Sequence, residues 1–290
     1  MIIDLHSHTN FSDGALSPPQ LVQRAVSNGV SHLAITDHDC TGGLEVALLA
    51  TESAQLQIIP GVEISCLWQQ REVHVIGLFI DTAEPHLQAL LQGQQLLRME
   101  RAQEFADRLQ AIGISGLMDY IQSLPCQAVS RNHIADFLIK EGRATDKQQA
   151  FKKFLGNNGR VRTAAHWCSI ATAVAGIRAA NGIAVLAHAD RYRLTRMKLI
   201  LLIEEFKDAG GEGIEVSYSN LSHEQLLSMA KLCEEMELWA SVGSDFHTPD
   251  AGWMDLGRIR QLPQNCRERA IWLHPRWAGS ESDPVARYIT

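Results

Sequence analysis

Short runs of β-branched and apolar residues alternate along most of the chain with longer segments in which apolar residues recur at helical spacing. Strands are predicted over residues 2–6, 32–36, 58–66, 72–80, 183–188, 213–216 and 239–243. Strands that alternate with helices in this way are typical of parallel β/α units. The pattern therefore predicts an α/β protein built around a mostly parallel sheet.

The helices have recognisable start and stop signals. Ser17 stands before two prolines, which is typical of an N-cap followed by a first helical turn, and Asn28-Gly29 ends the apolar repeat that begins at Leu21. The same spacing predicts helices over 43–54, 169–181 and 222–237. Each of these helices follows or precedes a predicted strand, as a β/α barrel requires.

One region departs from the alternation. Residues 85–162 contain a long helical stretch and further helical patterns over 132–141 and 145–155, with no strand pattern, and they end in a Gly/Asn cluster at 156–159. Such a cluster is a strong loop signal. We predict a barrel in two parts, residues 1–84 and 163–290, separated by an all-helical insertion at 85–162 that caps the substrate site.

Composition restricts the classes of partner. The 290-residue chain is 46% hydrophobic and 20% charged, as in an ordinary globular protein, and its net charge is −7. A negative net charge argues against broad electrostatic contact with duplex DNA, although a local cationic pocket can still bind one or a few phosphates. No protein partner is evident from the sequence.

The cysteines and the apolar runs bear on localisation. Six cysteines are scattered without paired spacing, which favours reduced thiols over a disulfide framework. The N-terminus has no basic leader and no apolar run reaches the ~18 residues that a membrane span needs. These features predict a cytoplasmic protein.

The residues with the most chemical information are histidines and carboxylates at the ends of apolar runs. Imidazole and carboxylate together form the ligand set of zinc, manganese and iron. In a β/α barrel the carboxyl ends of the strands face one shared mouth, so residues that are distant in sequence become neighbours. The residues that follow predicted strands in this way are His6, Asp37, His38, His188, Asp245 and His247.

Each signal also has an ordinary structural explanation. His6 and His8 point to the same side of an extended segment and can share an ion, but two solvent-facing histidines fit almost as well. Glu63 lies within an apolar run and needs a positive partner, which a position between two metal ions would provide. His74, flanked by valines, would by itself be a buried core histidine. Separate structural explanations for all the clusters together are improbable.

Five histidines are kept apart from this set. Four lack a carboxylate-bearing motif, so solvated or hydrogen-bonded roles are expected for His32, His86, His166 and His223, and the role of His274 is left open.

The ordered motifs resemble those of the PHP (polymerase and histidinol phosphatase) superfamily. These motifs are Asp4-x-His6-x-His8 with Ser12-Asp13-Gly14, Ile35-Thr36-Asp37-His38-Asp39, Pro60-Gly61-Val62-Glu63-Ile64, Leu186-Ala187-His188-Ala189 and Gly243-Ser244-Asp245-Phe246-His247. Within the superfamily the chain is most similar to bacterial 3′,5′-nucleoside bisphosphate phosphatases and the RNase AM exoribonucleases, which also have a helical insertion and an Arg-x-His like Arg131-Asn132-His133. The resemblance implies a distorted (β/α)₇ TIM-like barrel with a trinuclear site.

The resemblance also implies roles for particular residues. One ion would bind His6, His8, Glu63 and Asp245, a second would share Glu63 and add His74 and His188, and a third would bind Asp13, His38 and His247. Asp4 and Asp37 would fix imidazole tautomers, and Arg131 and His133 would bind substrate phosphate. Manganese is favoured, with zinc or iron(II) as alternatives. Catalytic roles would fall to Glu63, His188, Asp245, His247 and Arg131.

The activity implied is hydrolysis of phosphate esters by a metal-activated hydroxide. The expected substrates are 3′,5′-bisphosphonucleotides such as pAp, converted to the nucleoside 5′-monophosphate and phosphate, or 5′-phosphorylated RNA, trimmed from 5′ to 3′. His188, His247 or His133 would protonate the leaving group. Two alternatives remain: a phosphatase acting on a small metabolite such as histidinol phosphate, and a non-catalytic metal-binding PHP module.

Overall fold

An eight-stranded sheet forms the centre of the computed structural model, which describes residues 1–51 and 56–278. Its order is β1-β2-β3-β4-β6-β7-β8, with β5 beside β3. Leu5 donates its N–H to the Val242 carbonyl at 3.0 Å, and Ser7 forms a parallel bridge with Phe246, so the two ends of the sheet meet. The predicted α/β barrel is confirmed. The strands are β1 (Ile3–Asp4), β2 (His32–Ile35), β3 (Gln57–Trp68), β4 (Arg71–Leu78), β5 (Cys168–Ser169), β6 (Ile183–Leu186), β7 (Gly213–Tyr218) and β8 (Trp239–Gly243).

Strand β4 departs from the predicted parallel arrangement, because it runs antiparallel to both β3 and β6. The turn between β3 and β4 contains only Gln69 and Gln70, both at positive φ (45° and 65°), and so short a turn can join only antiparallel strands. The amino end of β4 therefore lies at the barrel edge where the parallel strands have their carboxyl ends. This reversal brings His74, near the start of β4, to the mouth of the barrel.

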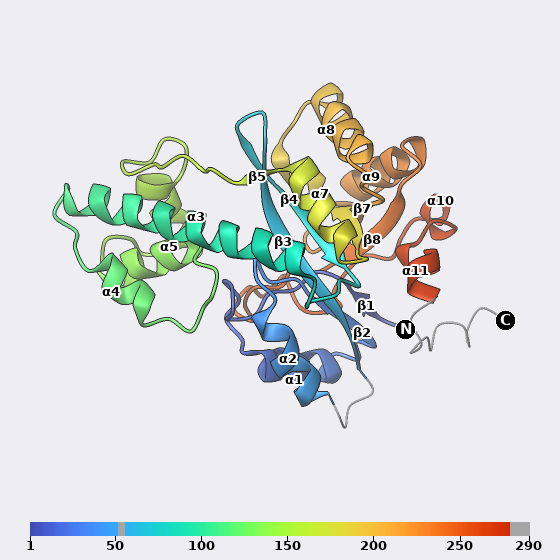
Figure 1. Cartoon of the computed structure of the whole chain (residues 1–290), viewed down its shortest axis with the longest axis horizontal. Coiled ribbons are helices and arrows are strands. Elements are labelled where there is room, and N and C mark those ends of the chain that lie inside the picture. Colours follow the sequence, from blue (N-terminus) through green and yellow to red (C-terminus); the bar gives the residue numbers. More distant parts are fainter. Residues whose placement is uncertain (52–55, 279–290) are drawn as a thin grey trace.

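Helices cover the outside of the sheet, with α1 and α2 on one side and α7, α8 and α9 on the other (Figure 1). At the start of α1, the Gln20 side chain accepts the Ser17 N–H at 2.9 Å. The predicted helix over 43–54 ends at Ala50, and residues 52–55 lie outside the described part of the chain. The helices are α1 (Pro18–Ser27), α2 (Gly42–Ala50), α7 (Ile170–Ala179), α8 (Arg196–Asp208), α9 (His223–Glu235), α10 (Gln264–Arg267) and α11 (Pro275–Ala278), with 3₁₀ turns η2 (Ala189–Tyr192) and η3 (Ile271–Leu273).

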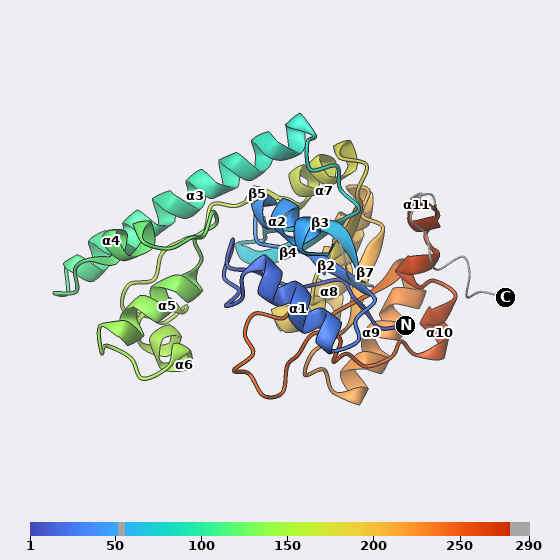
Figure 2. The same cartoon turned by 90° about the horizontal axis from the view of Figure 1, so that it is seen from below.

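Between β4 and β5 the chain forms helices that project to one side of the barrel (Figure 2). They pack around their own hydrophobic cluster, which includes Phe105, Ile134 and Phe137 and is separate from the barrel core. The boundaries 85–162 of an insertion stay a prediction. The helices are α3 (Pro85–Gln110), α4 (Leu117–Gln122), α5 (Arg131–Lys140), α6 (Lys147–Ala150) and the π-helical turn η1 (Phe151–Leu155).

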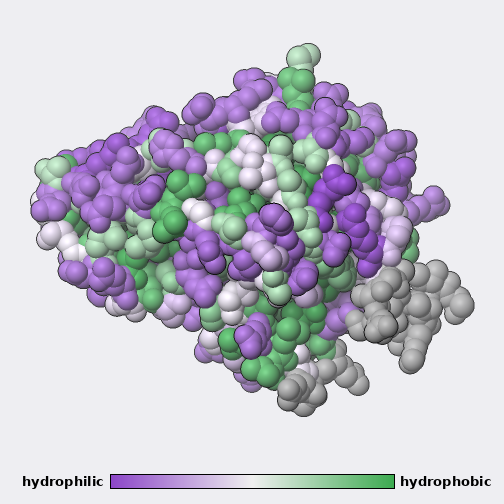
Figure 3. Space-filling model, viewed as in Figure 1, coloured by the Kyte–Doolittle hydropathy of each residue, from purple (hydrophilic) through white to green (hydrophobic). Residues whose placement is uncertain are grey.

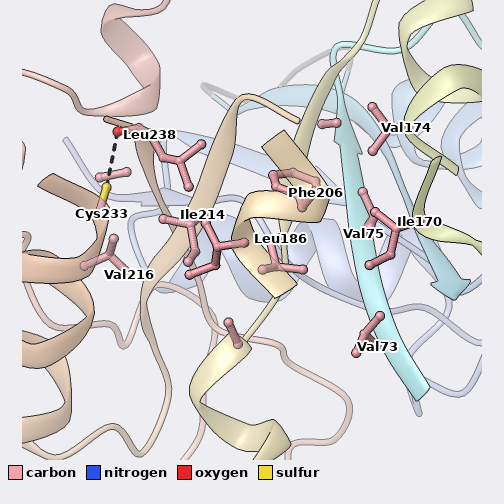
Figure 4. Packing of buried hydrophobic residues seen from close by; sticks show 14 of the residues in the cluster. Val73, Val75, Ile170, Val174, Leu186, Phe206, Ile214, Val216, Cys233 and Leu238 are labelled. Atoms are coloured by element: carbon pink, nitrogen blue, oxygen red, sulfur yellow. Dashed lines mark hydrogen bonds between the residues drawn. The ribbon is translucent and has the colours of Figure 1, made fainter. Parts of the chain in front are cut away.

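The barrel core fixes the strands that carry the site. Leu186 of β6 and Ile214 of β7 are fully buried and belong to the same cluster as Phe206 of α8 (Figure 4). Burying one such side chain contributes about 1.5–3 kcal/mol. Hydrophilic residues cover much of the face shown in Figure 3. No described helix is long and apolar enough to cross a membrane.

Candidate metal centre

Glu63, in the middle of β3, is surrounded by five imidazoles. Its Oε1 lies 2.9 Å from His74 Nδ1 and 3.1 Å from His188 Nε2. Its Oε2 lies 3.0 Å from His38 Nδ1 and 3.3 Å from Nε2 of both His6 and His8. Glu63 is completely buried. A single carboxylate thus connects residues from four segments of the barrel.

The remaining predicted ligands extend this cluster on two sides. Asp245 Oδ1 lies 3.3 Å from His6 Nε2 and 3.4 Å from His8 Nε2. Asp13 Oδ1 lies 3.3 Å from His247 Nε2 and 3.7 Å from His38 Nε2. All nine residues predicted as metal ligands from the sequence therefore come together at one edge of the barrel.

The backbone turns sharply where two of these side chains enter the site. His188 follows β6 with φ 28°, and Asp245 follows β8 with φ 55°. Non-glycine residues rarely adopt positive φ, and such conformations cluster at functional sites because the surrounding structure must hold them. The strand ends are thus shaped to direct these side chains inward.

The spacing of the ligand atoms fits divalent cations. Two atoms that bind one ion at about 2.1 Å in tetrahedral geometry lie about 3.4 Å apart. His6 Nε2 and His8 Nε2 are 3.1 Å apart, close to this value, and both face Glu63. Glu63 Oε2 and Asp13 Oδ1 are buried and accept no hydrogen bond from the described residues. Such oxygens need a cation nearby, so the donor set is a candidate metal site.

The charges of the cluster depend on one another. Burial alone would raise the pKa of Glu63, but the imidazoles of His74 and His38 hold it well below its usual range. Burial likewise opposes the charged form of His247, yet Asp13 and Asp245 raise the pKa of His247 to about 9. His8 differs, because burial and the neighbouring His247 lower its pKa to about 3. Opposite charges thus keep the carboxylates ionised in a largely buried site.

Asp4 and Asp37 were predicted to fix imidazole tautomers, but the hydrogen bonds of both carboxylates are with backbone N–H and hydroxyl groups. Asp4 accepts the backbone N–H groups of Ser244 at 2.7 Å and Gly257 at 2.8 Å. Asp37 accepts hydrogen bonds from the hydroxyls of Thr9 and Ser12, both at 2.6 Å. These two carboxylates hold the loops that carry the ligands, because the short Asp side chain reaches the adjacent loop backbone before it reaches a ring.

The residue that does contact a ligand imidazole is Glu215, which the sequence analysis missed. Its Oε1 lies 3.1 Å from His6 Nδ1, and its Oε2 accepts the backbone N–H of His188 at 2.7 Å. Glu215 is buried within β7. A carboxylate inside an apolar strand is the signal that identified Glu63, and it would have identified Glu215 as well.

Arg191 was also missed. It forms an ion pair with Asp245, and its guanidinium lies 4.4 Å from the centre of the Tyr218 ring. It comes from the 3₁₀ turn η2, directly after His188. The sequence signal that could have identified Arg191 is its position three residues after the strand-end ligand His188.

The N-terminus of α5 touches the ligand Asp13. The Ser130 hydroxyl and the Asn132 side-chain amide each donate to Asp13 Oδ2 at 2.8 Å. Asp13 Oδ1 remains directed to the imidazoles of His38 and His247. The helical region therefore takes part in building the site as well as covering it.

A cavity of about 170 Å³ lies between the cluster and these helices. Asp13, His38 and His74 line one side, and Arg131 and Trp167 line another. Arg131 Nη2 lies 3.1 Å from Glu72 Oε2, and the side chain of Arg131 is one-third exposed. His133 is not among the lining residues; its Nδ1 accepts the Ser130 N–H at 3.0 Å in the cap of α5.

The histidines kept apart from the ligand set lie elsewhere. His86, His166 and His223 are exposed. His32 is buried with its Nδ1 3.0 Å from the Ser31 hydroxyl, and His274 Nε2 lies 3.2 Å from Glu212.

The chain is similar to known proteins over nearly its whole length. The 3′,5′-nucleoside bisphosphate phosphatase of Chromobacterium violaceum is 40% identical over 93% of this chain and 95% of its own. The 5′-3′ exoribonuclease Rnm of Escherichia coli strain K12 is 41% identical over 91% of this chain and 90% of its own. Residues 4–97 match the PHP domain model. The chain belongs to the PHP family.

A solved structure shares the fold and most of the insertion. It is an amidohydrolase from Chromobacterium violaceum, described with bound sulfate and no metal, and it is 39% identical with a TM-score of 0.87. The match covers 94% of this chain and 95% of that one. The family resemblance seen in the motifs is thereby confirmed along the whole chain.

Proposed function

We propose that this PHP protein is a metal-dependent phosphoesterase that removes the 3′ phosphate from 3′,5′-bisphosphonucleotides, trims 5′-phosphorylated RNA from its 5′ end, or does both. The observation that carries the proposal is the convergence of imidazoles and carboxylates on Glu63 beside a cavity bordered by Arg131. The relatives named as a bisphosphate phosphatase and an exoribonuclease, each about 40% identical, support this substrate class.

We propose three divalent ions, the first held by His6, His8, Glu63 and Asp245, the second by Glu63, His74 and His188, and the third by Asp13, His38 and His247. The ligand atoms lie in overlapping groups, because His38 is close to Glu63 and His74 as well as to Asp13 and His247. Manganese is our preferred ion, with zinc or iron(II) as alternatives. Bound cations would neutralise the phosphate charge and lower the pKa of attacking water.

We assign a second phosphate to Arg131. Its side chain lines the same cavity as His38 and His74, and it contacts Glu72 and the Phe151 ring. Arginine presents a planar fork that matches phosphate oxygens, so one phosphate can lie at the cluster while another contacts Arg131. The sulfate in the related Chromobacterium structure is a phosphate-like anion, which agrees with an anion-binding site.

Proton transfer to the leaving oxygen would fall to His188 or His247, both of which lie in the cluster, if that residue is not committed to a metal ion. Burial lowers the pKa of His133, and its Nδ1 accepts the Ser130 N–H. We therefore assign His133 a positioning role at the start of α5, rather than the phosphate contact or proton transfer considered from the sequence.

One parallel assay tests the proposal. The manganese-loaded protein is incubated with pAp, AMP, histidinol phosphate and a short 5′-phosphorylated RNA, and released phosphate and nucleotides are measured. Turnover of pAp or stepwise 5′ trimming of the RNA supports the proposal. Faster turnover of histidinol phosphate would indicate a metabolite phosphatase, and no turnover of any substrate would indicate a non-catalytic module.

A further inference from the structure

Five arginines line a second cavity, of about 330 Å³, which we call the arginine groove. This density of cations is unexpected in a chain whose net charge is −7. The arginines are Arg71, Arg101, Arg131, Arg162 and Arg191.

The positive charge of the groove is only partly balanced. Glu72 lies between Arg101 and Arg131, at 2.8 Å and 3.1 Å, and Arg191 pairs with Asp245. No carboxylate in the described ranges pairs with Arg71 or Arg162, and both residues are exposed. Five guanidinium groups against two carboxylates leave the groove strongly positive, as a phosphate-binding surface requires.

The groove adjoins the metal centre through other residues than those that line the inner cavity. The inner cavity is bordered by His38 and His74, whereas the groove begins at Arg191 and Tyr192. Arg191 contacts Asp245, and the Tyr192 ring lies 5.6 Å from the His188 ring. Glu72, Arg101 and Arg131 line both cavities and form the wall between them.

The inner cavity and the arginine groove can thus hold the two parts of an RNA that lie on either side of one reacting phosphate. We propose that the inner cavity holds the 5′-terminal nucleotide and that the arginine groove holds the phosphate backbone of the RNA on the 3′ side of the bond being cleaved. Arg71 and Arg162 then determine how well the enzyme uses RNA relative to a mononucleotide such as pAp, whose 3′ end stops at the cluster. This inference rests on the proposed function.

Guanidinium contacts to phosphates carry no base information and release counterions on binding. RNA binding at the groove should therefore be independent of sequence and should weaken as salt rises. For a single strand, each lost phosphate contact lowers the slope of log affinity against log salt by roughly 0.7.

The test compares the double variant Arg71→Ala/Arg162→Ala with the control Arg143→Ala/Lys198→Ala, which removes two exposed cations that have no side-chain partner among the described residues. Binding of a 5′-phosphorylated RNA of about ten nucleotides is measured by fluorescence anisotropy with chelator present, so no cleavage occurs. We expect the groove variant to bind on the order of tenfold more weakly, with a salt slope smaller by about 1.4. The control should match the parent protein.

A second measurement compares kcat/KM for the same RNA and for pAp. The inference predicts a loss on RNA that exceeds the loss on pAp by at least about tenfold. Equal losses on both substrates would place the mononucleotide's own phosphate in the groove and overturn the inference, as would RNA binding equal to that of the control. A parent protein inactive on both substrates would refute the proposed function, while the binding measurement would still decide the role of the groove.

Discussion

The metal centre and the helical region next to it differ in how their side chains are held. Except for Asp13, the ligands of the centre lie on barrel strands or within four residues after them, and six of the nine are at most 8% exposed. Arg131 and Arg101, by contrast, come from helices that pack around their own hydrophobic cluster. We propose that the barrel places the chemistry and that the helices set substrate choice.

This division explains how one barrel can serve several phosphoesterases. Changes in the helices alter which phosphates are bound, whereas the strand ends keep the ligand geometry. The two regions meet at several points: Ser130 and Asn132 hold one oxygen of Asp13, and Arg98 of α3 contacts Asp39 and Ser65 of the barrel. The following predictions test whether the two regions act as separately as this arrangement suggests.

The largest effect is expected for Glu63→Gln. The amide keeps the shape of the side chain but removes the charge that faces His6, His38 and His74. Activity on every substrate should fall about a thousandfold or more. Metal analysis by mass spectrometry should show a loss of more than one ion, since Glu63 connects two ligand groups. Glu45→Gln on the exposed face of α2 serves as the control; retained activity in a folded Glu63→Gln protein would contradict the bridging role.

The next effect concerns substrate choice. Arg131→Ala should lower kcat/KM for pAp roughly a hundredfold, because a charge-assisted phosphate contact of about 2–4 kcal/mol is lost. An aryl phosphate with no second phosphate should lose much less. Bound metal should not change, because Arg131 contacts Glu72 and no ligand of the centre. Equal losses on the two substrates would mean that Arg131 serves the reacting phosphate itself.

The metal centre could be predicted from the sequence better than the helical region could. The reason is the same difference in how the side chains of the two regions are held. His6, His188 and Asp245 could be predicted because each follows an apolar strand, and barrel topology brings strand ends together whatever the loops do. The antiparallel direction of β4 could not be predicted from its apolar pattern, which is the same for either direction. His74 was therefore assigned as a ligand through the family resemblance and not through its strand.

In the helical region no periodic pattern shows where a helix packs against the barrel. The contacts of Asn132 with Asp13 and of Arg131 with Glu72 depend on that packing. The arginines of the groove come from β4, α3, α5, the loop before β5 and η2, so their convergence is visible only in three dimensions. Glu215 differs from these residues. It lies in the barrel and was missed, although its position inside an apolar strand was visible in the sequence.

A smaller effect is expected for Glu215→Gln. The change weakens the interaction with His6 Nδ1 but leaves every proposed ligand in place. Such outer contacts typically contribute 10–100-fold in metal affinity or activity. We expect the manganese concentration for half-maximal activity to rise about tenfold or more, while activity at saturating manganese recovers most of the parent value. Loss that excess manganese does not restore would give Glu215 a direct part in the reaction.

The smallest effect is expected at the contact between the two regions. Asn132→Ala removes the amide that donates to Asp13 Oδ2, but the Ser130 hydroxyl still donates to the same oxygen at 2.8 Å. One hydrogen bond to a charged group contributes about 1.5–3 kcal/mol, and the remaining donor should limit the loss to roughly tenfold or less. The loss should appear mainly as weaker binding of the ion at Asp13, His38 and His247, measured by manganese titration of activity. Asp13→Ala provides the reference for complete loss of that ion, with about one ion fewer per chain. If Asn132→Ala instead changed only KM for pAp and left the manganese titration unaltered, Asn132 would belong to the substrate pocket and not to the metal centre.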